Sequence, residues 1–115
     1  MAGNVEKKLN ELGIALPAAP APVANYVAFV RTGNLLTVSG QLCFGAGGKL
    51  AATGRLGGFI NSAPGFADGP KVMNGASDLM VAAFGDCGKH ARSTVGVAAL
   101  PADAAVEVEG LFEVA

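Results

Sequence analysis

The last third of the chain, residues 89–115, constrains the fold more than any other segment, because it holds two runs of strand-forming residues. The first run covers residues 93–100, the second covers residues 105–114, and the turn-forming residues 101–103 (Pro-Ala-Asp) join them. Apolar or alternating runs on both sides of a proline predict a β-hairpin, or a strand pair with a proline corner. We therefore expect both runs to belong to a β-sheet.

The second of these runs alternates between two kinds of side chain. Val106, Val108, Gly110, Phe112 and Val114 share one face of a strand, and Glu107, Glu109, Leu111 and Glu113 share the other. Successive side chains of a strand point to opposite faces of the sheet. The pattern predicts a sheet with one dry face.

Arg92 is the candidate functional residue of this segment. It lies at the start of the first run, between the small residues Ala91 and Ser93. A planar guanidinium in such a place can donate two parallel hydrogen bonds to a carboxylate or a phosphate. A surface arginine paired with one of the glutamates is the alternative. The residues alone leave both interpretations open.

Three segments in order resemble the Rid family, the YjgF-like reactive intermediate deaminases. The last segment reads HARSTVGVAALPADAAVEVEGLFEV, with the A-R-S strand, the short L-P turn and the acidic V-E-V-E strand of that family. Residues 24–42 (ANYVAFVRTGNLLTVSGQL) are similar to its first hairpin, and residues 72–85 (VMNGASDLMVAAFG) are similar to its second helix. The resemblance covers most of residues 20–115.

The resemblance implies an α+β fold like that of a bacterial chorismate mutase. Its sheet is mixed but largely antiparallel, helices pack on one face, and three subunits assemble with their sheets at the centre and small-molecule clefts between them. The whole chain, residues 1–115, would be a single domain. Residues 1–23 would form an N-terminal helix and a proline-rich arm, and residues 24–115 would form the core.

The activity that the resemblance implies is the hydrolysis of short-lived enamine and imine acids to 2-keto acids and ammonia. By position, Arg92 would bind the substrate carboxylate and Glu107 would orient water or transfer a proton. The residues that would line the cleft are Tyr26, Ser39, Asn74 and Thr94, with Tyr26 arriving from a neighbouring subunit. Thr94 stands where many active relatives carry a cysteine, which puts any thiol role in doubt.

Three other functions stay open beside the deaminase. One is a non-catalytic trimer that binds a small carboxylate or has a regulatory role. Another is a chaperone-like holdase, which leaves no signature in the sequence. The third is RNA cleavage, a label attached to some relatives as endoribonuclease. His90 is the one histidine of the chain and the net charge is −1, so neither a histidine pair nor a basic groove supports that chemistry.

One stretch departs from the family pattern. Family members carry a first sheet-packing helix between the strand near residues 49–53 and the strand that ends near Ile60. Here residues 54–59 (GRLGGF) connect the two directly, without a helical period. The resemblance therefore implies the loss of a helix and most of a strand, on the order of 35 residues.

Three explanations of that gap stay open: a true deletion, a segment excised from the sequence with its flanks joined, or a remodelled smaller fold. A true deletion would uncover apolar surface on one face of the sheet. In that case we predict poor solubility or a rearranged assembly.

Composition excludes several classes of partner. Lysine and arginine together number 8 and are scattered, so no basic stripe is available to nucleic acid. Cys43, Cys87 and His90 do not have the spacing of metal ligands, and we expect free thiols. No nucleotide or flavin motif is present. We predict no metal and no cofactor, with a small imino or keto acid as the ligand.

Hydrophobic residues make up 51% of the chain and charged residues only 15%, which is a sparse charge covering for a free monomer and favours buried subunit contacts. No apolar run approaches the roughly 20 residues of a membrane span, and the first residues lack the apolar segment of a signal peptide. We therefore expect a cytoplasmic homotrimer without a membrane partner.

Local patterns predict the remaining elements. A short helix is expected after Asn4, which can cap it, and Gly13 can end it. Residues 14–25 hold three prolines and are expected to form an extended arm. Residues 26–31 and 34–42 are expected to form strands around a tight turn.

A longer helix is expected from the first turn at Pro70, capped by Asp68 or Gly69, to a stop at Gly85. Its apolar stripe comprises Val72, Ala76, Leu79 and Ala83, widened by Met73, Met80 and Phe84. A stripe of this width is typical of a helix that packs on a sheet.

Overall fold

The computed structural model of the protein describes residues 3–16, 26–41 and 50–114. The helices and strands are α1 (Asn4–Glu11), β1 (Phe29–Thr32), β2 (Leu35–Gln41), β3 (Leu50–Asn61), α2 (Gly69–Phe84), β4 (Ala91–Val97) and β5 (Val106–Val114), with single turns of 3-10 helix, η1 at Gly85–Gly88 and η2 at Pro101–Asp103. Most of the proline-rich arm, at 17–25, lies outside the described residues, as does Cys43.

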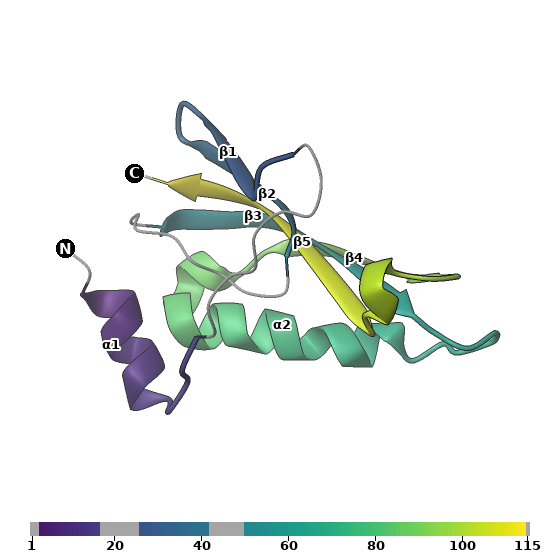
Figure 1. The fold of residues 1–115 in the computed structure, drawn as a ribbon. Coiled ribbons are helices and arrows are strands. Elements are labelled where there is room, and N and C mark those ends of the chain that lie inside the picture. The colour runs from purple at the N-terminus through teal and green to yellow at the C-terminus, as the bar shows by residue number, and fades with distance from the viewer. Residues whose placement is uncertain (1–2, 17–25, 42–49, 115) are drawn as a thin grey trace.

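The strands form a five-stranded sheet in the order β1-β2-β5-β3-β4. β3 and β4 are parallel and are connected through α2, whereas the other neighbours are antiparallel. α2 lies across one face of the sheet, and α1 lies beside α2 on that same side (Figure 1). The predicted α+β fold, with a largely antiparallel sheet and helices on one face, is confirmed.

The predicted first hairpin is confirmed, but its first strand begins at Phe29 rather than at Tyr26 and its loop lies one residue later than expected. Thr32 pairs with Leu35, which leaves Gly33 and Asn34 as the two-residue loop. Gly33 has a φ of 59°, a conformation that glycine adopts without the cost of a Cβ. A positive φ at the first loop residue suits the right-handed twist of the flanking strands.

The expected pairing of the last two strands with each other is wrong. β3 lies between β4 and β5 and pairs with both, in parallel with β4 and antiparallel to β5. The proline turn at residues 101–103 therefore carries the chain over β3 rather than into a tight hairpin. Ala102 and Asp103 each have a φ of 55° there, and the side-chain amide of Asn61 donates to Asp103 Oδ1 at 3.2 Å.

The expectation of two separate strands around residues 54–59 is also wrong. β3 is one strand of 12 residues that pairs with β5 from Leu50 to Ile60, with register irregularities near Ala52 and Gly54. Pairing with β5 along its length and with β4 from Arg55 onward satisfies the backbone groups of the glycine-rich middle of the strand. One continuous strand thus takes the place of the two strands that were expected.

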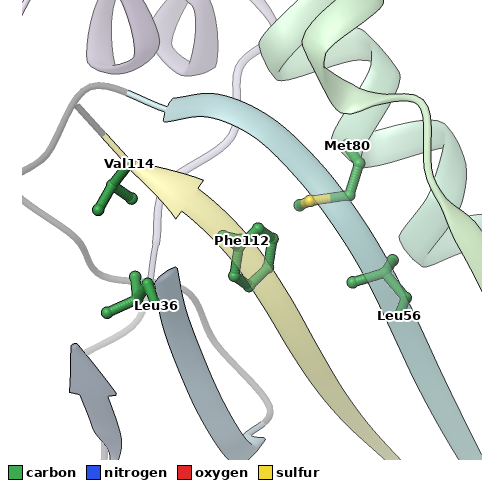
Figure 2. Close-up of a cluster of buried hydrophobic side chains, with 5 residues drawn as sticks. All are labelled: Leu36, Leu56, Met80, Phe112 and Val114. Atoms are coloured by element: carbon green, nitrogen blue, oxygen red, sulfur yellow. The ribbon is translucent and has the colours of Figure 1, made fainter. Parts of the chain in front are cut away.

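The core lies between α2 and the sheet. Leu36, Leu56, Met80, Phe112 and Val114 form its buried cluster (Figure 2). Leu56, on β3, is fully buried. The dry face predicted for the last strand is confirmed in its second half, because Gly110, Phe112 and Val114 are buried while Leu111 and Glu113 between them are exposed.

α2 begins and ends as predicted, and it packs on the sheet through the predicted apolar stripe, with Val72 as the exception. Asp68 is the N-cap and Gly85, with a φ of 62°, ends the helix. Met73 and Met80 are the buried residues of α2, whereas Val72 is 42% exposed. Met73 lies directly on Gly58 of β3, where a Cβ would overlap its side chain. The absence of a side chain at Gly58 therefore leaves the space that Met73 occupies against β3.

α1 forms close to the predicted place, with Gly3 rather than Asn4 at the N-cap position. Gly13 follows it with a φ of 67°. None of its residues is buried, so its apolar side chains add little to the core. In the described part of the chain, no helix is long and apolar enough to cross a membrane.

Candidate functional site

The register of the sheet places Arg92 on the face that α2 covers. Arg92 pairs with the buried Leu56, and Thr94 pairs with Gly58, on which Met73 of α2 packs. Paired residues of neighbouring strands point to the same face. Arg92 and Thr94 therefore project from the edge strand β4 toward α2, and both are half-buried.

Three groups of α2 surround the Arg92 guanidinium. Its Nη1 donates to Asn74 Oδ1 at 3.1 Å and to Ser77 Oγ at 2.9 Å, and its Nη2 donates to the carbonyl oxygen of Pro70 at 3.3 Å. Residues three or four apart lie on one side of a helix, so Pro70, Asn74 and Ser77 all face Arg92 from the same side of α2. Asn74, an expected site residue, therefore lies within hydrogen-bond distance of Arg92.

The charge of Arg92 meets only neutral acceptors. All nine acidic side chains lie in the described part of the chain, and none of them forms an ion pair with Arg92. The alternative in which Arg92 pairs with a glutamate of β5 is therefore wrong. A half-buried cation without a counter-charge costs free energy, so this position favours an anionic ligand.

The guanidinium also keeps donors for such a ligand. Arginine has five N–H groups, and the described residues accept from both hydrogens of Nη1 and from one of Nη2. Nε–H and the second N–H of Nη2 have no acceptor among the described residues. Two donors on one guanidinium can bind the two oxygens of a carboxylate.

Thr94 lies beside Arg92 on the same face of β4. Its hydroxyl oxygen is buried and has no hydrogen-bond partner in the described part of the structure. Its methyl group is close to Gly69 at the start of α2, where an added Cβ would lie 3.4 Å from it. The helix start therefore encloses Thr94 and leaves it no direct contact with solvent at the hydroxyl.

Ser77 and His90 belong to the same cluster, although the sequence patterns did not single them out for it. His90 Nε2 lies 3.0 Å from Ser77 Oγ, and His90 Nδ1 lies 2.6 Å from the carbonyl oxygen of Gly88. His90 precedes Arg92 by two residues and Ser77 follows Asn74 by three. Those spacings were the available signal, because they place each residue on the same face as its partner.

Glu107 does not share this face. It pairs with Phe59, which in turn pairs with Val95, so these residues belong to the side of the sheet that α2 does not cover. Arg92 shares its side with Leu56 and Gly110 instead. One chain therefore does not bring Glu107 to Arg92.

Tyr26 and Ser39 lie toward the other edge of the sheet. The hydroxyl of Ser39 donates to the carbonyl oxygen of Val27 at 2.8 Å, which holds β2 against the chain just after the exposed Tyr26. β2 is three strand positions from β4, a distance of roughly 14 Å at the usual spacing. Asn74, Arg92 and Thr94 thus form one group, and Tyr26 and Ser39 form another.

A hollow of about 350 Å³ opens away from the Arg92 cluster. Its lining residues are Thr37, Val38, Arg55, Gly57, Glu109, Gly110 and Leu111. Arg55 is the cation of this hollow, but it already lies 3.8 Å from the Glu109 carboxylate and donates to Ser93 Oγ at 3.0 Å. A substrate carboxylate would compete with Glu109 there, so the Arg92 cluster is the better anion site. The described residues contain no group of three or more metal-ligating side chains.

No family model matches the sequence of this chain. Protein TCP17 of Trypanosoma cruzi is 40% identical, and the alignment covers 96% of this chain and 94% of that protein. The alignment spans 151 positions whereas the chain has 115 residues, so at least 36 positions (151 less 115) hold no residue of this chain.

The fold matches solved structures of the same class, an α+β sheet with helices on one face. The protein Atu1372 of Agrobacterium tumefaciens, described as of unknown function, has 33% sequence identity and a TM-score of 0.83, with 96% of this chain and 92% of that chain covered. RidA of an Antarctic Psychrobacter species has 26% identity and a TM-score of 0.60, with 83% and 93% covered. The chain belongs to the Rid/YjgF family, as its three sequence segments indicated.

Proposed function

We propose that this protein hydrolyses short-lived enamine and imine acids to 2-keto acids and ammonia, with Arg92 as the residue that binds the substrate carboxylate. One observation carries the proposal: Arg92 is half-buried, hydrogen-bonded to three neutral acceptors of α2, and without a carboxylate partner among the acidic residues, all of which the structure describes. Membership of the Rid/YjgF family supports it.

The chemistry needs few groups. Water adds to the imine carbon, a proton passes to nitrogen, and the C–N bond of the resulting aminoalcohol breaks to release ammonia and leave the 2-keto acid. Holding the carboxylate fixes the neighbouring imine carbon, and a side chain that orients the water or transfers a proton lowers the barrier further. Arg92 supplies the first function, and we assign the second to Glu107.

The site is proposed to form between subunits of a homotrimer. Arg92, Asn74 and Thr94 lie at the β4 edge of one chain, Tyr26 and Ser39 lie toward the β1 edge, and the side chain of Glu107 is on the opposite face. In this arrangement a neighbouring chain supplies Tyr26, Ser39 and Glu107 to the site that Arg92, Asn74 and Thr94 form. This arrangement makes catalysis depend on assembly.

A non-catalytic carboxylate-binding role is the second candidate function. The observation that favours it is the separation of Glu107 from Arg92 within one chain. If no subunit contact brings a proton-transferring group to the bound acid, the cluster would hold a 2-keto acid without turning over an imine.

The test compares two arginine variants. The imine is generated in the cuvette by an amino-acid dehydratase, and formation of the 2-keto acid is followed with and without the protein. Arg92→Lys loses the paired donors and should lower kcat/KM by at least about tenfold, the loss expected for a charge-assisted hydrogen bond. Arg55→Lys, on the other face, is the matched control and should change kcat/KM less than about twofold.

Each result decides between the candidates. An active wild type with an unaffected Arg92→Lys variant would overturn the assignment of Arg92. A wild type that binds 2-oxobutanoate through Arg92 but does not accelerate keto acid formation would support the binding role and overturn the deaminase.

A further inference from the structure

Ser77 and His90 connect Arg92 to the backbone through consecutive hydrogen bonds. Arg92 Nη1 lies 2.9 Å from Ser77 Oγ, Ser77 Oγ lies 3.0 Å from His90 Nε2, and His90 Nδ1 lies 2.6 Å from the carbonyl oxygen of Gly88. Ser77 comes from the middle of α2, His90 immediately precedes β4, and Gly88 ends η1. The series therefore joins three elements around one guanidinium.

When the imidazole of His90 is neutral, the chemistry of the partners gives the direction of each hydrogen bond. A carbonyl oxygen can only accept, so His90 Nδ1 carries the hydrogen and a neutral imidazole leaves Nε2 as an acceptor. Ser77 must then donate its hydroxyl hydrogen to Nε2. Arg92 can only donate, so the oxygen of Ser77 accepts from it. All the donors point the same way, from Arg92 through Ser77 and His90 to Gly88.

We propose that Ser77 and His90 are positioning residues that hold the Arg92 guanidinium in the orientation that binds the substrate carboxylate. The bond to His90 prevents the hydroxyl of Ser77 from rotating, which keeps its lone pair aimed at Arg92. With Asn74 and Ser77 holding both hydrogens of Nη1, the free donors on Nε and Nη2 face a fixed direction. Hydrogen bonds in a series also strengthen one another.

Gly88, at the end of the series, is packed closely against the backbone of α2. A Cβ on Gly88 would overlap the carbonyl group of Met80 in α2, and Gly88 is buried. The carbonyl oxygen that accepts from His90 is therefore held against the helix that also carries Ser77 and Asn74. The geometry around Arg92 is set by packing as well as by hydrogen bonds.

The inference rests on the proposed function, since it assigns these residues a part in binding the same carboxylate. A serine hydroxyl that donates to a histidine is also the geometry of a nucleophile and its base. Ser77 differs from such a nucleophile because its oxygen accepts a hydrogen bond from Arg92. It therefore supports the guanidinium.

The first test measures the rotation of the guanidinium directly. Nitrogen-15 NMR of the arginine side chains resolves Nη1 and Nη2 only while rotation within the guanidinium is slow. We expect separate Nη signals for Arg92 in the wild type, averaged signals in Ser77→Ala and His90→Leu, and separate signals again in His90→Gln, which keeps an acceptor for Ser77. Ser93→Ala, on the other face of β4, is the control and should leave the signals unchanged.

The second test separates positioning from catalysis by kinetics. Because Arg92 contacts the carboxylate in both the ground state and the transition state, Ser77→Ala should raise KM roughly fivefold to tenfold and change kcat less than about twofold. Ser77→Thr, which keeps the hydroxyl, should recover most of the wild-type KM. A loss of kcat by a factor of about 1,000 with unchanged KM would mark Ser77 as a nucleophile and overturn the proposal.

Failure of this inference and failure of the proposed function give different results. Averaged Arg92 signals in the wild type would overturn the positioning role whatever the activity. Separate signals that average in Ser77→Ala, together with no binding of 2-oxobutanoate to the wild type, would support the restraint of Arg92 and overturn the carboxylate-binding function.

Discussion

At the scale of single residues, Arg92 and Arg55 show how partner choice separates a ligand-binding cation from a structural one. Arg55 lies near Glu109 on the open face of the sheet, whereas Arg92 lies under α2 with neutral acceptors. Both are arginines within strands and both stand beside a small residue, so the local sequence left open which of them pairs with a glutamate. What distinguishes them is the face of the sheet, which is set by the register of β3 against β4.

The Thr53 hydroxyl tests what a buried polar group without a hydrogen-bond partner costs in stability. Its residue is 3% exposed, and its hydroxyl oxygen is buried without a hydrogen-bond partner among the described residues. Thr53→Val keeps the shape and removes the desolvated hydroxyl, so the free energy of unfolding should rise by roughly 1 kcal/mol. Urea unfolding measures this, with the exposed Thr37→Val as a control that should change it by less than about 0.5 kcal/mol. A loss of stability in Thr53→Val would show that the hydroxyl has a partner.

At the scale of elements, local sequence patterns predicted those features that depend on residues close together in the sequence. The presence of the first hairpin, the start and stop of α2 and the alternation in the second half of β5 all follow from turn residues, caps and periodicity. The position of β3 between β4 and β5 did not follow, because strand order depends on pairing between segments far apart in sequence. For the same reason the sequence placed Arg92 and Glu107 in one site, whereas the register puts them on opposite faces.

Two glycines on and after α2 give a matched test of the packing. Gly88→Ala would place a Cβ onto the backbone of Met80, and an overpacked site that cannot relax should lose about 3 kcal/mol of unfolding free energy. Gly75→Ala, exposed in the middle of α2 with no atom within 4 Å of the added Cβ, should gain up to about 1 kcal/mol. Urea unfolding of both variants measures the difference. Equal stabilities would show that η1 is not held against α2.

At the scale of the whole molecule, the face of the sheet opposite α2 has no helix over it in the described structure. Val30, Leu35, Val95 and Leu111 lie on this face by register and are 54%, 52%, 50% and 37% exposed. Exposed apolar groups on one face are typical of a protein interface. We propose that these faces meet at the centre of the trimer.

We also propose where the alignment with protein TCP17 has positions that hold no residue of this chain. These positions would fall within β3, where the family's first helix is expected.

Native mass spectrometry of the wild type and of two variants tests the trimer. One variant changes the open face of the sheet and the other changes the exposed side of α2. The wild type should have three times the 11.4 kDa of one chain. Leu111→Lys places a charge on the open face of the sheet and should give monomers, because burying an unpaired charge is costly. Val81→Lys, on the exposed side of α2, is the control and should stay trimeric. A monomeric wild type, or a trimer that tolerates Leu111→Lys, would contradict this assembly.

The central claim is that the Arg92 cluster binds the carboxylate of a small 2-keto or imino acid, and a crystal structure with 2-oxobutanoate tests it most directly. We expect the carboxylate of the bound acid within about 3 Å of Nε and Nη2 of Arg92, while Asn74, Ser77 and the Pro70 carbonyl keep their hydrogen bonds to the guanidinium. Density for the acid at Arg55 in the opposite hollow, or none at Arg92 at a saturating concentration, would contradict the claim.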